Sequence, residues 1–356
     1  MDPAKLREPF ECWLAARWPD AENLRVGELA SPKSGFSALT LVAPVRLRRA
    51  GRECEAKVVL RIESPDPAVY PQQAPGLDVE VEVQYRVMEA LARTGKLPLA
   101  GLVGYEADAS LLGAPFFAME FVPGEVAIEH PPYTQQGFFR DAEPAERRRM
   151  TLGGLEALAM LHALDWREAG LGWLVAPGAE PDYARQLAIW ESFAERELAG
   201  REHPVLRAGF EHVRARLPAG LPSRFSWGDS RLGNIIFQGS RAACITDFEA
   251  ACIAPPQVDL GWWLMFDRTM HESVGIDRLP GEPTREEQRD HYARCAGRDP
   301  GDTHLHEVFA AVRYSAIVVR VMNRAVARGF LPADQRIWLT NPASAALADL
   351  LGLPRP

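Results

Sequence analysis

The chain has 356 residues, of which 47% are hydrophobic and 25% charged, and this length and composition predict a globular protein large enough for two domains. Its formal net charge of −8 argues against nucleic acid or an anionic membrane as a partner, whereas a cationic small molecule is compatible with it. Five widely spaced cysteines without a C-x-x-C pair indicate free thiols rather than disulfides or a zinc site, and the absence of an apolar leader or a membrane-spanning stretch predicts a cytoplasmic protein.

The first third of the chain predicts a small sheet with helices. Apolar residues at helical spacing indicate helices over 4–18 and 78–93. Short apolar runs between turn-forming residues predict strands at 24–29, 37–45, 55–62, 102–105 and 115–121. The small-residue loop at 31–36 could turn backbone N–H groups toward phosphate oxygens, and an ordinary hairpin turn is an equal interpretation.

After residue 123 the patterns become mainly helical, so we place a domain boundary there. The expected helices cover 144–164, 183–198, 203–217, 284–296, 305–328 and 333–351. A long aromatic-containing loop over 125–142 could line a binding pocket. The histidines within 302–306 are interpreted as part of a capped helix start with exposed side chains and not as metal ligands, because no third ligand is near in sequence.

The polar groups best suited to catalysis lie within residues 223–249. Asp229 is followed five positions later by Asn234 in a loop that contains glycines. Apolar runs at 235–237 and 243–246 predict a hairpin that returns the chain to Asp247, close to Asn234. Asn and Asp together offer the hard oxygen ligands that Mg²⁺ prefers, and a separate carboxylate can accept the proton of an attacking hydroxyl. A D-x-x-x-x-N pattern by itself is also common in surface loops.

The segment resembles the catalytic and metal-binding loops of the aminoglycoside phosphotransferase-like enzymes, which share the protein-kinase fold. The matching positions are Gly228, Asp229, Asn234, Asp247 and Glu249. Trp227 stands where the family usually has a His that supports the loop. The resemblance implies an α+β, bilobal, protein-kinase-like fold: a small antiparallel-sheet lobe over 1–122, a mainly helical catalytic and acceptor-binding lobe over 123–356, and ATP between them.

The same resemblance implies transfer of the γ-phosphoryl group from Mg-ATP to a hydroxyl of a small molecule. Asp229 would be the catalytic residue, and Asn234 and Asp247 would hold Mg²⁺. The acceptor stays open: a hydroxyacyl compound and an amino alcohol are both compatible, and the oligomeric state is open as well. An inactive nucleotide-binding pseudokinase is the alternative, because the departures from the family pattern occur together at Trp227, Arg61 and Gln84.

Four positions are expected to contact the nucleotide by this resemblance. Arg61 occupies the place of the family's phosphate-binding Lys and is interpreted as a variant of it, with a surface Arg on a strand edge as the alternative. Ser37 falls loosely in the phosphate-covering loop, and the C=O of Glu120 and the N–H of Val122 match the hinge that binds adenine. The partner of Arg61 on the following helix stays open among Gln84, Glu82 and Glu80.

Two further residues are expected to support the site without taking part in the chemistry. Asp259 can cap the helix that it begins, and the resemblance implies that it also braces the catalytic loop from behind. His162 is expected to be a packed residue at a helix end.

Overall fold

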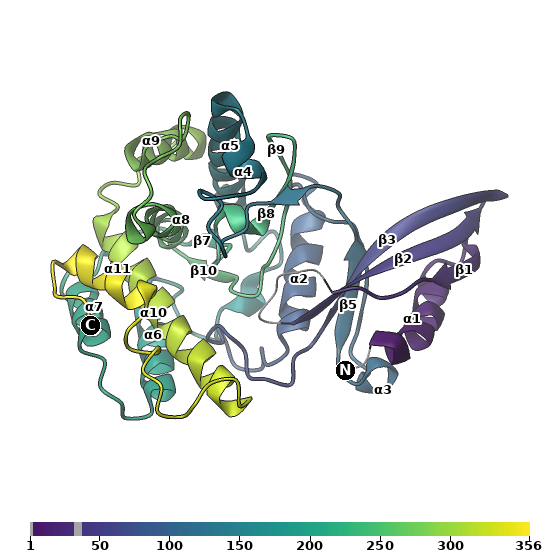
Figure 1. Cartoon of the computed structure of the whole chain (residues 1–356), viewed down its shortest axis with the longest axis horizontal. Coiled ribbons are helices and arrows are strands. Elements are labelled where there is room, and N and C mark those ends of the chain that lie inside the picture. Colours follow the sequence, from purple (N-terminus) through teal and green to yellow (C-terminus); the bar gives the residue numbers. More distant parts are fainter. Residues whose placement is uncertain (1–2, 32–37) are drawn as a thin grey trace. The chain divides into compact units, whose positions relative to one another are not determined.

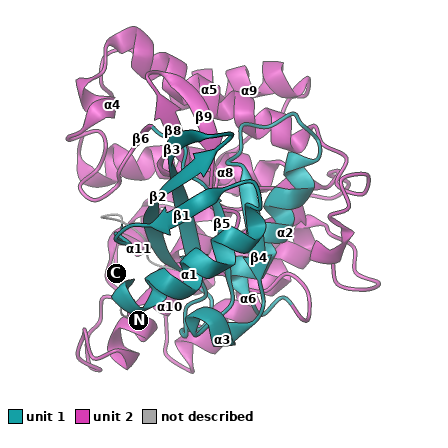
Figure 2. Cartoon of the chain, turned by 90° about the vertical axis from the view of Figure 1, so that its right-hand side faces the viewer, with its two compact units in different colours: residues 1–68, 77–123 teal, residues 69–76, 124–356 magenta. Residues whose placement is uncertain are grey.

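The computed structural model describes residues 3–31 and 38–356, so the predicted nucleotide contact Ser37 and most of the predicted phosphate-covering loop lie outside the described residues. The chain divides into two compact units, one of residues 1–68 and 77–123 and the other of residues 69–76 and 124–356 (Figure 2). The predicted domains, 1–122 and 123–356, did not contain the excursion of 69–76 into the second unit. The expected α+β class is confirmed: the first unit is built on an antiparallel sheet and the second is mainly helical (Figure 1).

The first unit holds a five-stranded antiparallel sheet of order β1-β2-β3-β5-β4. Its strands are β1 (Glu22–Val26), β2 (Leu39–Arg49), β3 (Arg52–Ile62), β4 (Leu102–Glu106) and β5 (Phe116–Glu120). Its helices are α1 (Pro3–Arg17), α2 (Glu80–Ala92) and the short α3 (Ala109–Leu112). All elements expected for this part of the sequence are present.

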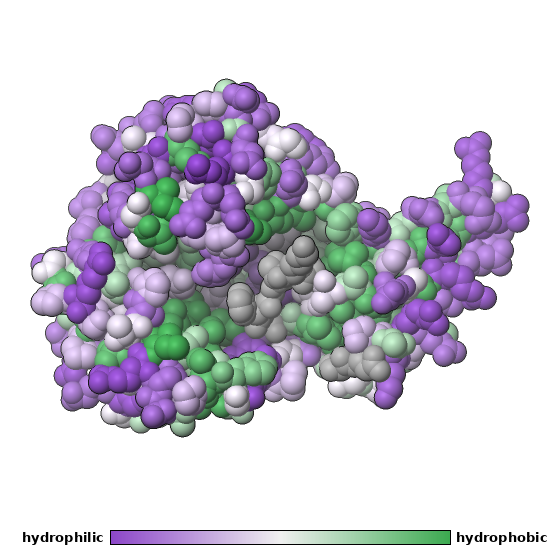
Figure 3. Space-filling view, in the orientation of Figure 1, coloured by the Kyte–Doolittle hydropathy of each residue, from purple (hydrophilic) through white to green (hydrophobic). Residues whose placement is uncertain are grey.

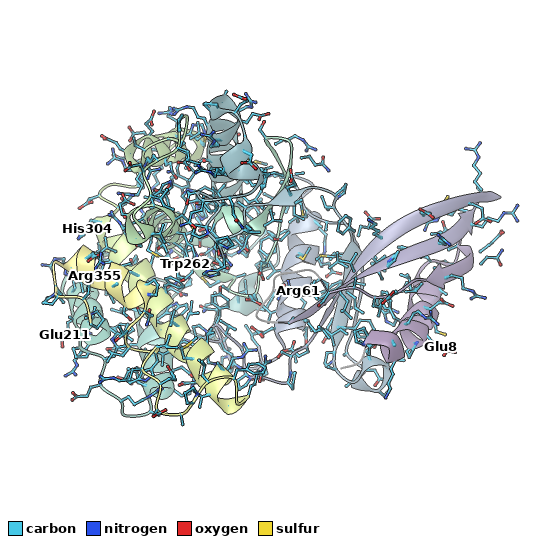
Figure 4. All side chains as sticks on the ribbon, in the orientation of Figure 1. Glu8, Arg61, Glu211, Trp262, His304 and Arg355 are labelled. Atoms are coloured by element: carbon cyan, nitrogen blue, oxygen red, sulfur yellow. The ribbon has the colours of Figure 1, made fainter. Side chains whose placement is uncertain are left out.

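The alternation of side chains along β3 sets the two faces of this sheet. Val58, Leu60 and Ile62 are buried in one apolar cluster with residues of α1. Arg61 therefore points to the other face (Figure 4), where its strand neighbour Phe117 meets Tyr85 of α2 with ring centroids 6.1 Å apart. The two helices thus cover opposite faces, and Arg61 lies on the α2 side.

The far end of the β2–β3 hairpin carries mainly hydrophilic residues (Figure 3). Arg46 and Glu55 form an ion pair across it, with Nε and Oε1 3.2 Å apart and both side chains at least 78% exposed. Such exposed pairs contribute only about 0–1 kcal/mol. The strand ladder, which pairs Leu39 with Ile62 through to Arg49 with Arg52, therefore holds this end together.

The second unit is organised around α10, which packs against four other helices of the unit (Figure 1). The helices are α4 (Phe138–Asp141), α5 (Pro144–His162), α6 (Tyr183–Leu198), α7 (Pro204–Ala215), α8 (Gln257–Met270), α9 (Arg285–Ala296), α10 (His304–Ala327) and α11 (Pro342–Leu351). Short 3₁₀ helices cover Gly172–Leu174, Leu232–Asn234 and Glu272–Val274. The strands form a β6-β8-β9 sheet and a β10-β7 pair: β6 (Glu125–Val126), β7 (Arg224–Ser226), β8 (Ile235–Gln238), β9 (Arg241–Ile245) and β10 (Cys252–Ala254).

Two expectations for the second unit were wrong in detail. The helix predicted over 333–351 begins only at Pro342, because the side chain of Asn341 caps it by accepting from the N–H of Ser344 at 3.0 Å. The histidines of the 302–306 segment are not both exposed: His304 is, whereas His306 is buried with Nδ1 3.0 Å from the hydroxyl of Tyr183. The three-residue strands β7 and β10 were not expected, since such short strands show no alternation in sequence.

All five cysteines are free thiols, as expected. One of them, Cys295 on α9, lies with His291 and Glu156 so that the three possible ligand atoms are within 4.8 Å of one another, and the expectation that no cysteine binds metal stays a prediction. Among residues 3–31 and 38–356, no helix is both long enough and apolar enough to cross a bilayer.

The burial of His306 predicts a pH-dependent contribution to stability. Burial lowers its pKa from the ordinary value of 6.5 to about 4, so the unfolded chain binds the proton first as the pH falls. The contribution is therefore complete above the unfolded pKa and is lost progressively as the pH falls from there toward the folded pKa. When the pH is lowered from 7 to 5, the free energy of unfolding should fall by roughly 2 kcal/mol less in His306→Gln than in the parent chain. Urea unfolding at the two pH values measures this. The exposed His304→Gln should keep the parent's pH dependence, and an equal pH dependence in His306→Gln would contradict the assignment.

Candidate active site

Asp229 is held by three hydrogen-bond donors in the interior of the second unit. Its side chain is buried, and Oδ1 accepts from Arg231 Nε and from Trp262 Nε1, each at 2.8 Å. Trp262 reaches it from α8 (Figure 4), and Asn234 Nδ2 donates to the other oxygen, Oδ2, also at 2.8 Å. The direction of this carboxylate is therefore fixed by two groups of its own loop and one from α8.

The charge of Asp229 is retained in spite of its burial. Burial by itself would raise its pKa, but the Arg231 guanidinium and the hydrogen bonds from Arg231, Asn234 and Trp262 outweigh it and lower the pKa below the ordinary value. The group is thus an ionised carboxylate at neutral pH, able only to accept hydrogen bonds or a proton.

The turn before Asp229 requires glycine. Gly228 has a φ of 85°, and a Cβ built on it would lie 2.0 Å from the carbonyl oxygen of Ala250. Any side chain there would collide with the backbone that follows the β8–β9 hairpin. The glycine of the expected Gly-Asp pair therefore lets two backbone segments approach closely.

Asn234 joins this loop to the hairpin. Its Nδ2 donates to the carbonyl oxygen of Asp229 as well as to the carboxylate, both at 2.8 Å, which leaves Oδ1 as the atom that can bind a cation. Its own carbonyl oxygen accepts from the N–H and the hydroxyl of Thr246, at 2.9 and 3.0 Å. The expected hairpin is confirmed, and the residue after Thr246 is Asp247.

Asp247 leaves the hairpin in a left-handed conformation, with a φ of 63°. Asp tolerates this conformation better than most residues other than glycine. The indole Nε1 of Trp227 donates to the carbonyl oxygens of Thr246 at 2.8 Å and of Asp247 at 3.1 Å. Trp227, at the position where the resembling family usually has a His, therefore ties the loop that precedes Asp229 to the end of the hairpin.

Asp259 braces the loop from behind, as the resemblance implied. Its Oδ2 accepts from the N–H of Trp227 at 2.7 Å and its Oδ1 from the N–H of Gly228 at 2.9 Å. The expectation that Asp259 caps its own helix was wrong: Pro256 is the N-cap of α8 and Asp259 lies in the first turn. The carboxylate binds the neighbouring loop because that loop presents two N–H groups to it.

His162 completes this support as a packed helix-end residue. Its Nε2 lies 3.1 Å from Asp259 Oδ2 and its Nδ1 lies 2.7 Å from the hydroxyl of Tyr292. Because an ionised carboxylate only accepts, Nε2 carries a hydrogen. Burial by itself would raise the pKa of Asp259. The hydrogen bond and charge of His162, together with the N–H groups of the loop, outweigh this effect and lower the pKa below its ordinary value.

Sequence reasoning missed Arg231 as a site residue. It forms ion pairs with Asp229 and with Glu129, which belongs to the 125–142 loop. Arg231 thus shares its positive charge between the loop carboxylate and a second acid beside it. Its place two residues after Asp229 was the signal that could have found it, whereas nothing in the sequence singles out Glu129.

Tyr70 was also missed, and no local pattern points to it. It lies in the 69–76 segment, which is fastened to the second unit by a hydrogen bond from Gln186 Nε2 to Gln73 Oε1 at 2.8 Å. Burial raises the pKa of Tyr70 well above its ordinary value, and the negative charges of Asp229 and Glu249 add to the shift. The excursion of the chain therefore brings a neutral phenol into the field of these carboxylates.

The expected nucleotide contacts of the first unit lie on its sheet. Arg61 is on the α2 side of β3, and its charge acts on Glu63, whose Oε2 accepts the N–H of Val81 at 2.9 Å. Glu82 binds Arg86 and the hydroxyl of Tyr105, so it is already engaged by other groups. The partner of Arg61 stays open among Gln84, Glu82 and Glu80.

Of the two expected hinge residues, Glu120 has a bonded N–H and Val122 does not, among the residues that the structure describes. Glu120 ends β5, and its N–H donates to the carbonyl oxygen of Gly101 at 2.7 Å. The N–H of Val122 makes no hydrogen bond within the described part of the chain. This donor is thus available to a ligand, as the hinge interpretation requires.

The donor set at Asn234 and Asp247 suits Mg²⁺. Asn234 Oδ1 and the Asp247 carboxylate are hard oxygen ligands, and Asn234 is oriented by the two bonds that its amide hydrogens make to Asp229. Carboxylate and amide oxygens on a loop that also presents an ionised Asp are the arrangement that phosphoryl transfer uses.

Comparison with known proteins identifies relatives in sequence. The family described as Phosphotransferase enzyme family matches residues 46–302. Acyl-CoA dehydrogenase family member 11 of Homo sapiens is 28% identical over 232 residues, which are 61% of this chain and 28% of that protein. Acyl-CoA dehydrogenase family member 10 of Mus musculus is 25% identical over 284 residues, 76% of this chain and 24% of that protein. The chain thus spans about a quarter of the length of these curated relatives.

Solved structures share the fold across almost the whole chain. A putative aminoglycoside phosphotransferase from Ralstonia eutropha has a TM-score of 0.70 at 23% identity, with 96% of this chain and 95% of that one covered. A macrolide 2′-phosphotransferase from Brachybacterium faecium has a TM-score of 0.53 at 21% identity, with 98% of both chains covered. At these identities the likeness establishes the protein-kinase-like fold alone, and with it the expected fold class.

The role of Trp227 can be tested by removing its indole N–H. Trp227→Phe leaves the carbonyl oxygens of Thr246 and Asp247 without this donor, so the free energy of unfolding should fall by about 1–2 kcal/mol more than in Trp190→Phe. Trp190 is a matched control, since it is also buried and its indole N–H makes no hydrogen bond among the described residues. Equal losses in the two variants, measured by urea unfolding, would contradict a loop-supporting role.

Proposed function

Because the chain belongs to the phosphotransferase enzyme family, we propose that it transfers the γ-phosphoryl group of Mg-ATP to a hydroxyl group of a small molecule. The observation that carries this proposal is the ionised, oriented carboxylate of Asp229, joined through Asn234 to the hairpin that ends at Asp247. A family match without these groups would support the fold and not the chemistry.

Asp229 acts on the acceptor. The acceptor oxygen forms a bond to the γ-phosphorus, the bond from that phosphorus to the β–γ bridging oxygen breaks, and the hydroxyl proton passes to Asp229. Because its pKa is lowered, Asp229 is a weak base and acts chiefly by orienting the hydroxyl. This suits a loose transition state, in which the proton need leave only when the new bond is well advanced.

Arg231 and Asn234 hold Asp229 in that orientation. Both donate to its carboxylate, and Arg231 also limits the negative charge beside the incoming phosphoryl group. Asn234 Oδ1 and the Asp247 carboxylate are the proposed Mg²⁺ ligands. The bound ion supplies neutralisation of the phosphate charge.

On the first unit, we place the phosphate contact at Arg61 and the adenine contacts at the carbonyl oxygen of Glu120 and the N–H of Val122. Ser37 is a further proposed contact to the phosphates. An aminoglycoside phosphotransferase solved with GDP and kanamycin has a TM-score of 0.58, and APH(4)-Ia solved with ADP and hygromycin B has one of 0.56. These neighbours support a nucleotide as the co-substrate.

We propose two classes of molecule as acceptors of the phosphoryl group. The names of the curated relatives refer to acyl-CoA dehydrogenases, which favours a hydroxyacyl compound. An ethanolamine kinase of Plasmodium vivax has a TM-score of 0.53, and the net charge of −8 suits a cationic amino alcohol. Nucleotide consumption should be measured with a panel of hydroxyacyl-CoA esters, choline, ethanolamine, aminoglycosides and macrolides. Transfer to none of them, with nucleotide binding retained, would favour the pseudokinase alternative.

Asp229→Asn should lower the rate of phosphoryl transfer by roughly 10²–10⁴-fold and change nucleotide affinity little, since the carboxylate acts on the acceptor. The new amide faces Asn234 Nδ2, so a loss of about 1–3 kcal/mol in unfolding free energy is also expected. Single-turnover rates, nucleotide affinity and circular dichroism together check this. The exposed Asp334→Asn makes the same chemical change elsewhere and should be silent. An unchanged transfer rate in Asp229→Asn would remove it from the chemistry.

Asp247→Asn should weaken the Mg²⁺-dependent part of nucleotide binding. Asn tolerates the positive φ of this position, so the substitution removes a charge without straining the backbone. The factor by which Mg²⁺ raises the affinity for ADP should then be at least about tenfold smaller than in the parent chain. Calorimetry with and without Mg²⁺ measures this factor in both proteins. The same Mg²⁺ dependence in both proteins would show that Asp247 is not a ligand.

A further inference from the structure

Three side chains with metal-binding atoms meet where α5 packs against α9 (Figure 1). His291 and Cys295 lie one turn apart on α9, so they project from the same face of that helix. Glu156 reaches them from α5. The ligand atoms of all three lie within 4.8 Å of one another. An imidazole, a thiol and a carboxylate from two helices thus converge on one point.

A single nitrogen of His291 faces both of the other ligands. Its Nε2 lies 3.1 Å from Glu156 Oε1 and 3.6 Å from Cys295 Sγ. In a tetrahedral Zn²⁺ site, the usual metal–ligand bond lengths place a bound nitrogen about 3.4 Å from a bound oxygen and about 3.6 Å from a bound sulfur. The three atoms are therefore spaced as the ligands of one such ion are, and small rotations of the side chains admit it.

The packing of α9 on the rest of the unit holds these ligands in place without a metal. Next to His291, the buried Tyr292 has its hydroxyl 2.7 Å from Nδ1 of His162, the last residue of α5. One turn before His291, Gln288 accepts from the indole Nε1 of Trp263 at 2.7 Å. Ligands that are already positioned lose little conformational freedom on binding, which favours a higher affinity.

The site is open to an ion from solvent. The side chains of Glu156 and His291 are 57% and 17% exposed, and Cys295 is exposed as well. Nη2 of the exposed Arg294 lies 3.5 Å from Nδ1 of His291, a long contact. A metal ion on Nε2 leaves the ring hydrogen on Nδ1, so the guanidinium turns away to solvent when the ion binds.

The ligand set selects the metal. A thiolate is a soft ligand that does not suit Mg²⁺ or Ca²⁺, whereas sulfur, imidazole and carboxylate together suit Zn²⁺. We propose that Glu156, His291 and Cys295 bind one Zn²⁺ ion at the contact between α5 and α9, with a water molecule as the fourth ligand. Binding displaces the proton of the thiol, which passes to the buffer.

This proposal departs from the sequence-based expectation that no cysteine binds metal. That expectation rested on the spacing of the cysteines, whereas the carboxylate ligand, Glu156, is 135 residues from His291. The site is also independent of the reaction proposed for Asp229, because none of its three ligands belongs to the candidate active site. Its experimental test therefore needs no acceptor and no nucleotide.

Cobalt binding tests the thiolate ligand directly. Co²⁺ replaces Zn²⁺ in tetrahedral sites, and a bond from Co²⁺ to a thiolate adds a strong absorption band in the near ultraviolet. The metal-free full chain, kept in millimolar Mg²⁺, should gain this band with one Co²⁺ per chain. Cys295→Ala should lose the band, whereas Cys54→Ala, which removes another exposed thiol, should keep it. Asn234 and Asp247 carry no sulfur, so Co²⁺ at the proposed Mg²⁺ site adds no such band.

Zinc affinity tests the other two ligands, in competition with a chromophoric chelator. His291→Gln and Glu156→Gln should each bind Zn²⁺ at least roughly tenfold more weakly than the parent chain, since even the loss of a group that only supports a ligand costs about 10–100-fold. Glu286→Gln, exposed on α9 and outside the site, should keep the parent's affinity. Zn²⁺ should also raise the melting temperature of the parent chain and not that of Cys295→Ala, because the ion links two helices of the folded chain.

Three results would overturn the proposal. One is that the parent chain gains no thiolate band with an excess of Co²⁺. Another is that Cys295→Ala keeps the band, which would place the metal at a different cysteine. The third is an equal affinity for Zn²⁺ in the parent chain and in Glu156→Gln, which would show that the ion does not bridge α5 and α9.

Discussion

The carboxylate of Asp259 is the group on which the geometry of the candidate site depends. It lies in the first turn of α8 and accepts hydrogen bonds from two consecutive N–H groups of the catalytic loop, so it fixes the backbone from which Asp229 projects. Burying an ion is costly unless its bonds are satisfied, and here both oxygens are engaged. The loop and the helix therefore determine each other: the helix places the acid, and the acid shapes the loop.

A buried cation, Arg313, also contacts the loop that Asp259 holds. Arg313 of α10 is 2% exposed and donates to the carbonyl oxygen of Gly228 at 2.7 Å, with its guanidinium over the ring of Trp262. Burial lowers the pKa of Arg313, and the nearby Cys252 and Asp259 oppose that shift. The N–H of Gly228 thus donates to a carboxylate, and its carbonyl oxygen accepts from a guanidinium. A turn held at both ends leaves the following Asp229 little freedom, which is the preorganisation that the proposed phosphoryl transfer would require.

The candidate site residues that could be predicted from the sequence are those that lie close together along the chain. Asp229, Asn234 and Asp247 stand out because a hairpin of fixed length returns the chain to its starting point, and the helices follow from apolar periodicity. Tyr70 and Glu129 could not be found in this way, since contacts between distant segments leave no spacing to read. The surplus length predicted for α11 has a different, local origin: the side chain of Asn341 accepts from the N–H of Ser344 and so begins the helix at Pro342.

The passage of residues 69–76 into the second unit has a consequence for how this protein can be divided. The chain crosses from one unit to the other after residues 68, 76 and 123, so the connectivity is interleaved. No single cut releases the helical unit whole: a fragment that starts at 124 has lost Gln73, the partner of Gln186, and Tyr70, the phenol near the acidic groups. Only a rearranged gene that supplied 69–76 separately would reproduce that unit on its own, which makes the two units inseparable by simple truncation.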